Sequence, residues 1–244
     1  MNPSENREMF GSRRAFLRAA GALVLLPAGM GAVRAQAPLK VGIIGSGRVG
    51  GTLGELWLKA GHEVMFSSLD LEHDKALAAK LGGKARAGTS RDAVAFGDVV
   101  FVAVPYGALP QLGKDLGSLL KGKVVFDACN PFPNRDGEVA TWAREKGAGF
   151  ATAELLPGAR IVRGFNAIGA GRLPGFAKEA MKVGMPIAGD DAEAIALASR
   201  LVRDVGLEPV LVGGLAMGRH LMPGTPLAGE HPPEKLKQVA ATLK

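Results

Sequence analysis

Residues 39–61 read LKVGIIGSGRVGGTLGELWLKAG, and three different signals follow one another within them. Three of the four residues at 41–44 are β-branched, which predicts a short buried strand. Residues 45–50, GSGRVG, then carry glycine at the first, third and sixth positions. From Leu53 onward the apolar residues recur at i, i+3, i+4 and i+7, which predicts an amphipathic helix that ends at Gly61. A glycine motif framed by a strand and a helix is typical of dinucleotide-binding folds.

Each glycine of this motif has a physical task in such a fold. Gly45 allows the tight turn out of the strand, Gly47 lets a pyrophosphate approach the backbone, and Gly50 lets the helix pack against the sheet. The exposed N–H groups and the positive end of the helix dipole then hold the phosphates without a cationic side chain. The expected cofactor contacts in this turn are Gly45, Ser46, Gly47, Arg48, Val49 and Gly50.

The first 35 residues resemble an export signal. Residues 12–18, SRRAFLR, have the twin-arginine pattern, and an uncharged, moderately apolar stretch follows at 19–33. That stretch is too short and too weakly apolar for a membrane span, and small residues suit cleavage after Ala35. We therefore expect a twin-arginine signal peptide at 1–35 and one NAD(P)-binding domain at 38–244, without a membrane span. The protein would be periplasmic or secreted, and an uncleaved N-terminal anchor is the alternative.

The composition argues against several classes of function. The chain of 244 residues has a formal net charge of +7, part of which comes from the arginines of the leader, and no dense basic run follows. Because nucleic-acid-binding surfaces need clustered basic and aromatic residues, we expect no nucleic-acid partner. Cys129 is the only cysteine, and the four histidines show no ligand spacing. The sequence therefore predicts neither an intramolecular disulfide nor a metal site.

The second expected strand, at 62–67, ends about 20 residues beyond the first glycines, where dinucleotide-binding folds contact the adenosine ribose. An acidic residue at this point favours NAD, and an arginine favours NADP. Here the residues are Ser67 and Ser68, and Asp70 and Glu72 come slightly late. We expect the two serines to contact the cofactor, and the sequence leaves NAD and NADP both open.

A continuous apolar run at 98–104 is typical of a central parallel strand buried on both faces, and further strands are expected at 124–127 and 160–165. Cofactors lie at the carboxyl ends of such strands. Asn130 stands before a proline, which holds it extended, close to the expected nicotinamide end. The residues expected to contact the cofactor, or to position the hydride transfer, at this edge are Ala103, Val104, Pro105, Asn130, Pro131 and Asn166.

Two other side chains at this edge allow two interpretations each. Tyr106 would either touch the cofactor or be a partly exposed aromatic of a loop. Cys129 could be a nucleophile, but no histidine or lysine lies at a telling distance in the sequence. We therefore expect Cys129 to be a small buried thiol.

Together these signals predict an α/β fold, a single Rossmann-like domain with a doubly wound, mainly parallel sheet of about eight strands. Residues 213–229 are rich in glycine, proline and methionine, and they fit either a loop that closes over a ligand or a plain surface loop. The other expected strands lie at 185–188 and 208–212, and the other expected helices lie at 74–81, 90–96 (capped by Ser90), 108–116, 138–146, from Asp190 or Asp191 to Gly206, and 233–243.

Six segments, taken together and in order, resemble the NADP-dependent reductases of the deazaflavin coenzyme F420. They are residues 45–53, 61–64, 102–105, 127–131, 163–166 and 188–191. The resemblance implies that the nicotinamide and deazaflavin rings exchange a hydride directly, so the protein positions two cofactors and needs no catalytic acid or base. It implies NADP or NAD as cofactor, with coenzyme F420 or a flavin as the second substrate. The family's usual Ser-Arg at the end of the second strand is Ser67-Ser68 here.

We therefore expect an NAD(P)-dependent oxidoreductase that transfers hydride between nicotinamide and a deazaflavin, a flavin-like molecule or another small acceptor. The expected partners are the nucleotide and the acceptor, with a homodimer as a further option. Hydroxyacid dehydrogenases and imino-acid reductases share the N-terminal domain but need a long helical C-terminal domain, and a metalloreductase needs transmembrane helices; neither feature is expected after Val212. The alternative from a different class is a non-catalytic, exported dinucleotide-binding protein that acts as a sensor or partner subunit.

Overall fold

The computed structural model describes residues 37–178 and 182–243. The fold and the site belong to one compact unit, Pro38–Lys244. The signal peptide at 1–35 lies outside the described residues and remains a prediction. Within the described ranges, no helix is both long enough and apolar enough to cross a membrane.

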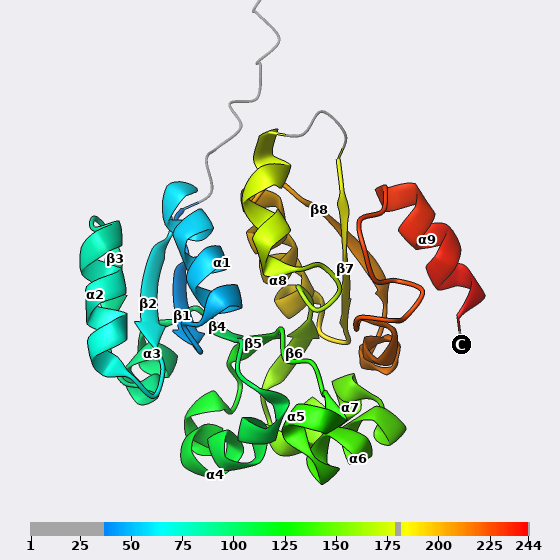
Figure 1. Cartoon of the computed structure of the whole chain (residues 1–244), viewed down its shortest axis with the longest axis horizontal. Coiled ribbons are helices and arrows are strands. Elements are labelled where there is room, and N and C mark those ends of the chain that lie inside the picture. Colours follow the sequence, from blue (N-terminus) through cyan, green and yellow to red (C-terminus); the bar gives the residue numbers. More distant parts are fainter. Residues whose placement is uncertain (1–36, 179–181, 244) are drawn as a thin grey trace, which may run out of the picture. The chain divides into compact units, whose positions relative to one another are not determined.

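Eight strands among the described residues form one sheet in the order β3-β2-β1-β4-β5-β6-β7-β8 (Figure 1). Neighbouring strands are parallel except for β6 and β7, which pair antiparallel. This topology confirms the predicted α/β fold with a mainly parallel sheet. The strands are β1 (Lys40–Ile44), β2 (Glu63–Ser67), β3 (Ala85–Ala87), β4 (Val99–Val102), β5 (Val124–Asp127), β6 (Arg160–Arg163), β7 (Gly184–Gly189) and β8 (Glu208–Gly213).

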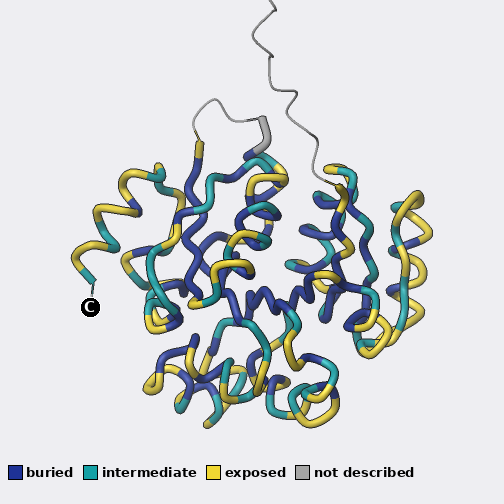
Figure 2. The backbone as a smooth tube through the Cα atoms, turned by 180° about the vertical axis from the view of Figure 1, so that it is seen from behind, coloured by how far each residue is buried: buried dark blue, intermediate teal, exposed yellow. Residues whose placement is uncertain are grey.

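Helices cover both faces of the sheet, so the side chains of each central strand alternate between two hydrophobic cores. Phe101 and Phe126 pack in the core with α1 and α8, whereas Val100 and Val125 pack in the core with α3, α4 and α7. Figure 2 shows the central strands as buried tube between more exposed helices. The helices are α1 (Arg48–Lys59), α2 (Leu71–Leu81), α3 (Ser90–Phe96), α4 (Leu109–Leu120), α5 (Pro133–Asp136), α6 (Glu138–Lys146), α7 (Ala148–Leu155), α8 (Ala192–Asp204) and α9 (Pro233–Thr242), with 3₁₀ turns at Tyr106–Ala108, Ala170–Lys178 and Leu215–His220.

Helix α1 lies close to the sheet and is anchored to a second helix. A Cβ atom on Gly54 would come within 2.3 Å of the Phe66 ring, so only glycine permits this approach. Trp57 is fully buried, packs edge-to-face on Phe101 with 5.0 Å between ring centroids, and donates its indole N–H to the carbonyl of Leu201 at 2.9 Å. These contacts fix the direction of the helix that begins at the glycine turn.

The sequence pattern misses three elements, β3, α5 and α7. β3 has only three residues, and α7 (AGFATAEL) is built largely from small side chains that do not form one apolar face. The start of one helix and the cap of another also differ from expectation. The side chain of Asp70 accepts from the N–H of His73, so α2 begins three residues earlier. Thr89, not Ser90, caps α3 in a reciprocal capping box with Asp92.

The segment 213–229 is packed against the domain. Leu221 and Leu227 are fully buried, and the N–H of Gly229 donates to the carbonyl of Ala167 at 2.9 Å. Part of the segment forms the 3₁₀ turn that packs against α7. Neither expected interpretation, a loop free to close over a ligand or a plain surface loop, describes this anchored segment.

Candidate functional site

The turn between β1 and α1 leaves a backbone surface that no side chain covers. Gly45 has a φ of +99°, and a Cβ atom on it would lie 2.5 Å from the carbonyl oxygen of Ala103. A Cβ atom on Gly50 would lie 2.0 Å from the carbonyl oxygen of Gly45, so the helix starts in direct contact with the turn. By contrast, no heavy atom lies within 4 Å of the Cβ position of Gly47. The space in front of α1 is therefore open at the glycine that is expected to face a phosphate.

The N-terminus of α1 has free binding capacity. Gly47 is the N-cap residue, its cap has no side-chain hydrogen bond, and the first turn has no acidic residue. The first N–H groups of a helix have no partner inside the helix, and its dipole places a partial positive charge at this end. Such a helix start is a ready binding site for a phosphate group.

A cavity of about 660 Å³ opens at this turn. Its wall is mostly apolar, and one side is formed by α4 through residues such as Leu112 and Leu116. The structure brings seven of the predicted contact residues into the lining: Gly45, Ser46, Gly47, Ser68, Ala103, Val104 and Pro105.

Other predicted contact residues do not line this cavity. Arg48 is exposed at the start of α1, Val49 is half-buried and Gly50 is buried against the turn. Asn130 and Pro131 lie further along the edge of the sheet, beyond β5. The structure therefore separates a glycine-turn region from an amide region, and both lie at the carboxyl ends of parallel strands.

Ser67 requires a correction. Its side chain is fully buried and donates its hydroxyl to the carbonyl of Ile43 at 2.7 Å, which ties the end of β2 to β1. A side chain used inside the sheet does not contact a ribose in the cavity. Of the two serines, Ser68 lines the cavity and remains the candidate ribose contact.

A buried carboxylate, unforeseen in the sequence, lies behind the glycine turn. Asp74 on the first turn of α2 has no exposed surface. One of its oxygens accepts a hydrogen bond from the hydroxyl of Ser46, and the other accepts from the hydroxyl of Ser68 at 2.9 Å. Asp74 therefore links the glycine turn to the end of β2.

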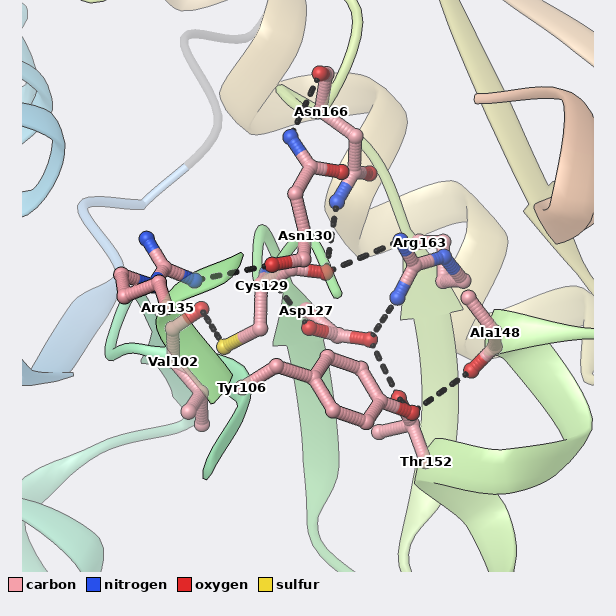
Figure 3. A network of polar contacts seen from close by, with 10 residues as sticks. All are labelled: Val102, Tyr106, Asp127, Cys129, Asn130, Arg135, Ala148, Thr152, Arg163 and Asn166. Carbon is pink, nitrogen blue, oxygen red and sulfur yellow. Dashed lines mark hydrogen bonds and ion pairs between the residues drawn. The ribbon is translucent and has the colours of Figure 1, made fainter. Parts of the chain in front are cut away.

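A second polar network lies where β5 and β6 end (Figure 3). Asp127 is fully buried, and its carboxylate accepts from the guanidinium of Arg163, from the hydroxyl of Thr152 at 2.8 Å and from the N–H of Cys129 at 2.7 Å. Arg163 also donates to the carbonyl of Cys129 at 3.0 Å. Because Asp127 and Arg163 bind the N–H and the carbonyl of Cys129, they fix the position of the next residue, Asn130.

Asn130 and Asn166 come together at this edge, as the strand ends predict. The side-chain N–H of Asn130 donates to the carbonyl of Asn166 at 2.9 Å, and that of Asn166 donates to the carbonyl of Cys129 at 3.4 Å (Figure 3). The side-chain oxygens of both asparagines are buried, and neither has a hydrogen-bond partner within the described part of the chain. Buried polar atoms are normally paired, so these two acceptors are suited to N–H or O–H donors of a ligand.

Tyr106 and Cys129 are both buried structural groups. The Tyr106 hydroxyl lies 3.1 Å from that of Thr152 and donates within this network; burial, then the nearby Asp127 charge, raises the pKa of Tyr106 above its ordinary value. This corrects both expected interpretations of Tyr106, as a cofactor contact and as a partly exposed loop residue. Burial raises the pKa of the Cys129 thiol well above its ordinary value, in agreement with the expected inert thiol.

Four residues of these networks have no role assigned from the sequence. Asp127 and Arg163 lie within segments that resemble the family, but their types alone do not reveal the ion pair. Asp74 follows an expected strand by only a few residues, and its partners become visible only when α2 folds back onto the turn. Thr152 lies on α7, whose lack of one apolar face hides the helix itself. Among the described residues, no group of three or more histidines, cysteines, aspartates and glutamates could hold a metal ion.

Comparison with known proteins shows which proteins the chain resembles. The family described as NADP oxidoreductase, coenzyme F420-dependent, matches residues 40–131, which include the glycine turn and Asn130. An F420-dependent NADP reductase of Methanothermobacter thermautotrophicus is 29% identical over 206 residues, which cover 78% of this chain and 87% of that protein. The chain is therefore similar to this family of reductases, whose family model matches less than half of the chain.

Two further proteins extend the comparison. The rat metalloreductase STEAP3 is 30% identical over 189 residues, or 76% of this chain, but the chain spans only 36% of the length of that protein. The solved structure of a hypothetical protein of Sinorhizobium meliloti is 26% identical, with a TM-score of 0.66, and covers 80% of this chain and 96% of its own. The fold shared with that solved structure therefore extends over most of the chain, beyond the segment that the family match covers.

Proposed function

We propose that this protein binds NAD or NADP along the carboxyl edge of its sheet and exchanges a hydride between the nicotinamide and a small acceptor. The observation that carries the proposal is the open, uncapped start of α1 at Gly47, which faces a cavity of about 660 Å³. The pyrophosphate would lie at this helix start, as in other dinucleotide-binding folds. Ser68 would contact the adenosine ribose, and Pro105 would lie on the way to the nicotinamide.

The amide region would receive the nicotinamide end. Nicotinamide carries a carboxamide with two N–H donors, and the buried oxygens of Asn130 and Asn166 are acceptors without a partner in the described chain. The ion pair beneath them holds the backbone at Cys129 and so fixes both amides. A nicotinamide cofactor supplies the hydride itself, so the protein needs to position the two reactants.

The titratable groups next to the amides support positioning rather than acid–base catalysis. The Asp127 carboxylate already accepts hydrogen bonds from Arg163 and Thr152. The pKa values of Tyr106 and Cys129 are raised, so the phenol and the thiol stay protonated near neutral pH. A direct hydride exchange between two aligned rings requires no proton transfer by the protein. The acceptor would be coenzyme F420, a flavin or a similarly flat electron carrier, reached in the periplasm after twin-arginine export.

Two measurements on one preparation test this function. Nucleotide released from protein purified out of the periplasm and identified by mass spectrometry should be NAD or NADP. Sedimentation of the intact protein tests whether it forms a homodimer. Oxidation of the reduced nucleotide should then require an added deazaflavin or flavin. A protein that binds the nucleotide tightly but never transfers hydride would favour the non-catalytic sensor. A protein that binds neither nucleotide would overturn the proposal.

A further inference from the structure

We propose that Asp74 makes this site selective for NAD over NADP. It would do so by holding the Ser68 hydroxyl as a hydrogen-bond acceptor and by placing a negative charge behind the ribose end of the cavity. The inference rests on the proposed function, since it concerns which nicotinamide dinucleotide enters the same cavity.

The direction of the Ser68 hydrogen bonds follows from simple proton counting. The Ser68 hydroxyl donates its single proton to a carboxylate oxygen of Asp74, 2.9 Å away. A second acceptor, the carbonyl of Asp70, lies 3.2 Å from the same hydroxyl, so the single hydroxyl proton stays inside the protein in either case. The Ser68 oxygen also accepts from the N–H of Asp70 at 3.1 Å. What Ser68 can still offer to the cavity is a lone pair.

A lone pair distinguishes the two nucleotides at the adenosine ribose. The free 2′-hydroxyl of NAD can donate a hydrogen bond to it. The 2′-phosphate of NADP carries acceptor oxygens and negative charge near neutral pH, so it gains no hydrogen bond from this atom. A ligand that leaves a polar contact unmade loses affinity relative to one that makes it.

The charged side chains around the ribose end of the cavity also disfavour the 2′-phosphate of NADP. The charged side chains in the lining are Asp70 and Asp115, and the described residues of the lining include no lysine or arginine. Asp70 and Asp74 both lie at the N-terminus of α2, where their carboxylates offset the positive helix dipole that could otherwise attract a phosphate. The nearby cation Lys75 is 57% exposed and pairs with Glu72 at 2.8 Å, and His73 is exposed on the same turn.

Asp74 also holds the glycine turn through Ser46, so one buried carboxylate serves both ends of the adenosine diphosphate site. Losing its charge should therefore alter selectivity more than the loss of an exposed carboxylate on the same helix. Glu72 provides that comparison, because it is exposed on the first turn of α2 and does not line the cavity.

The test is titration of the purified chain with NAD⁺ and NADP⁺ by calorimetry. We expect the wild type to bind NAD⁺ at least about tenfold more tightly than NADP⁺. Asp74→Asn removes the charge and supplies an N–H donor that reverses one serine hydrogen bond, so the preference should fall by about tenfold. Glu72→Gln, which frees Lys75 but leaves Ser68 and its hydrogen bonds in place, should change the preference far less than Asp74→Asn does.

Ser68→Ala keeps the test decisive if Asp74→Asn does not fold. It removes the lone pair, so NAD⁺ affinity should fall about tenfold while NADP⁺ affinity stays the same. Wild-type protein that binds NADP⁺ as tightly as NAD⁺ overturns the selectivity and leaves the proposed function intact. A folded Asp74→Asn variant with an unchanged preference overturns the role of Asp74. Failure of the wild type to bind either nucleotide overturns the proposed function itself.

Discussion

Arg163 and Asp127 form an ion pair in which neither side chain has any exposed surface. Both oxygens of the carboxylate are used, because Thr152 and the N–H of Cys129 also donate to it. The guanidinium in turn donates to the carbonyl of Cys129 at 3.0 Å. A buried ion pair of this kind contributes only modestly to the free energy of unfolding. Removal of one partner is costly, because the remaining charge is then buried with neither water nor an opposite charge beside it.

Arg163→Met should therefore destabilise the protein strongly. The substitution leaves the Asp127 carboxylate buried without its cation, and we expect the free energy of unfolding to fall by about 3–5 kcal/mol. Denaturant unfolding monitored by circular dichroism measures this change. The matched control is Arg160→Met, because Arg160 also pairs with an aspartate, Asp191, but at the surface, and its loss should cost far less. Equal losses in the two variants would show that burial of the pair is not what matters.

Gly47→Val should abolish nucleotide binding without unfolding the protein. The Cβ position of Gly47 has no heavy atom within 4 Å and its φ is −65°, so valine fits the chain, but its side chain fills the space where a pyrophosphate must approach. Calorimetric titration with NAD⁺ and a melting curve measure the two effects. Gly171→Val is the control, since Gly171 is equally uncrowded but does not line the cavity. Unchanged NAD⁺ affinity of the Gly47→Val variant would show that the pyrophosphate does not bind at this turn.

Ser68→Arg should shift nucleotide preference toward NADP. Arginine at this position restores the cation that the family usually carries there, and a guanidinium pairs well with a phosphate. We expect the ratio of NADP⁺ to NAD⁺ affinity to rise by about tenfold or more. Ser67→Arg would not be a fair comparison because Ser67 is buried, so the exposed neighbour Leu69 (Leu69→Arg) serves as the control for added charge. If both variants change the ratio equally, charge near the cavity matters and the position of Ser68 does not.

The low pKa of Asp191 predicts that its charge stops stabilising the protein only at acidic pH. Its hydrogen bonds from Arg160, and then from the N–H of Ala194, hold its pKa at about 2, below the ordinary 3.8. A carboxylate whose pKa is lowered by folding stabilises the folded state at any pH above its ordinary pKa. That stabilisation is lost as the pH falls through the pKa of the folded state. Asp191→Asn keeps the cap of α8 but loses the charge. The melting temperature of the wild type should therefore exceed that of the variant at neutral pH, and the difference should disappear between pH 3.8 and about 2. A difference that does not depend on pH would assign the effect to packing.

Local signals in the sequence were sufficient for the nucleotide end of the fold. The strand, the glycine turn and α1 are adjacent in the chain, and the close contact that requires glycine at position 50 is with Gly45 of the same unit. The convergence of Asn130 and Asn166 was also predictable, because neighbouring parallel strands end at one edge.

Contacts that depend on distant segments could not be predicted in this way. Asp74 gains its role only when α2 folds back on the turn, and Ser67 faces inward because β2 ends beside Ile43. Tyr106 is buried because α7, which the pattern does not reveal, lies over it and supplies Thr152. In each case the missing information is the identity of the neighbour.

The reversal of direction between β6 and β7 has a practical consequence for handling the protein. Because β7 and β8 run opposite to the other strands, the turn that leaves β7 at Asp190 lies at the edge of the sheet away from the carboxyl ends of β1, β4 and β5. A fluorescent dye or a surface tether attached at that turn would leave the entrance for small molecules unobstructed. Immobilised through this edge, the protein could be screened against whole collections of electron carriers to find the one that it uses.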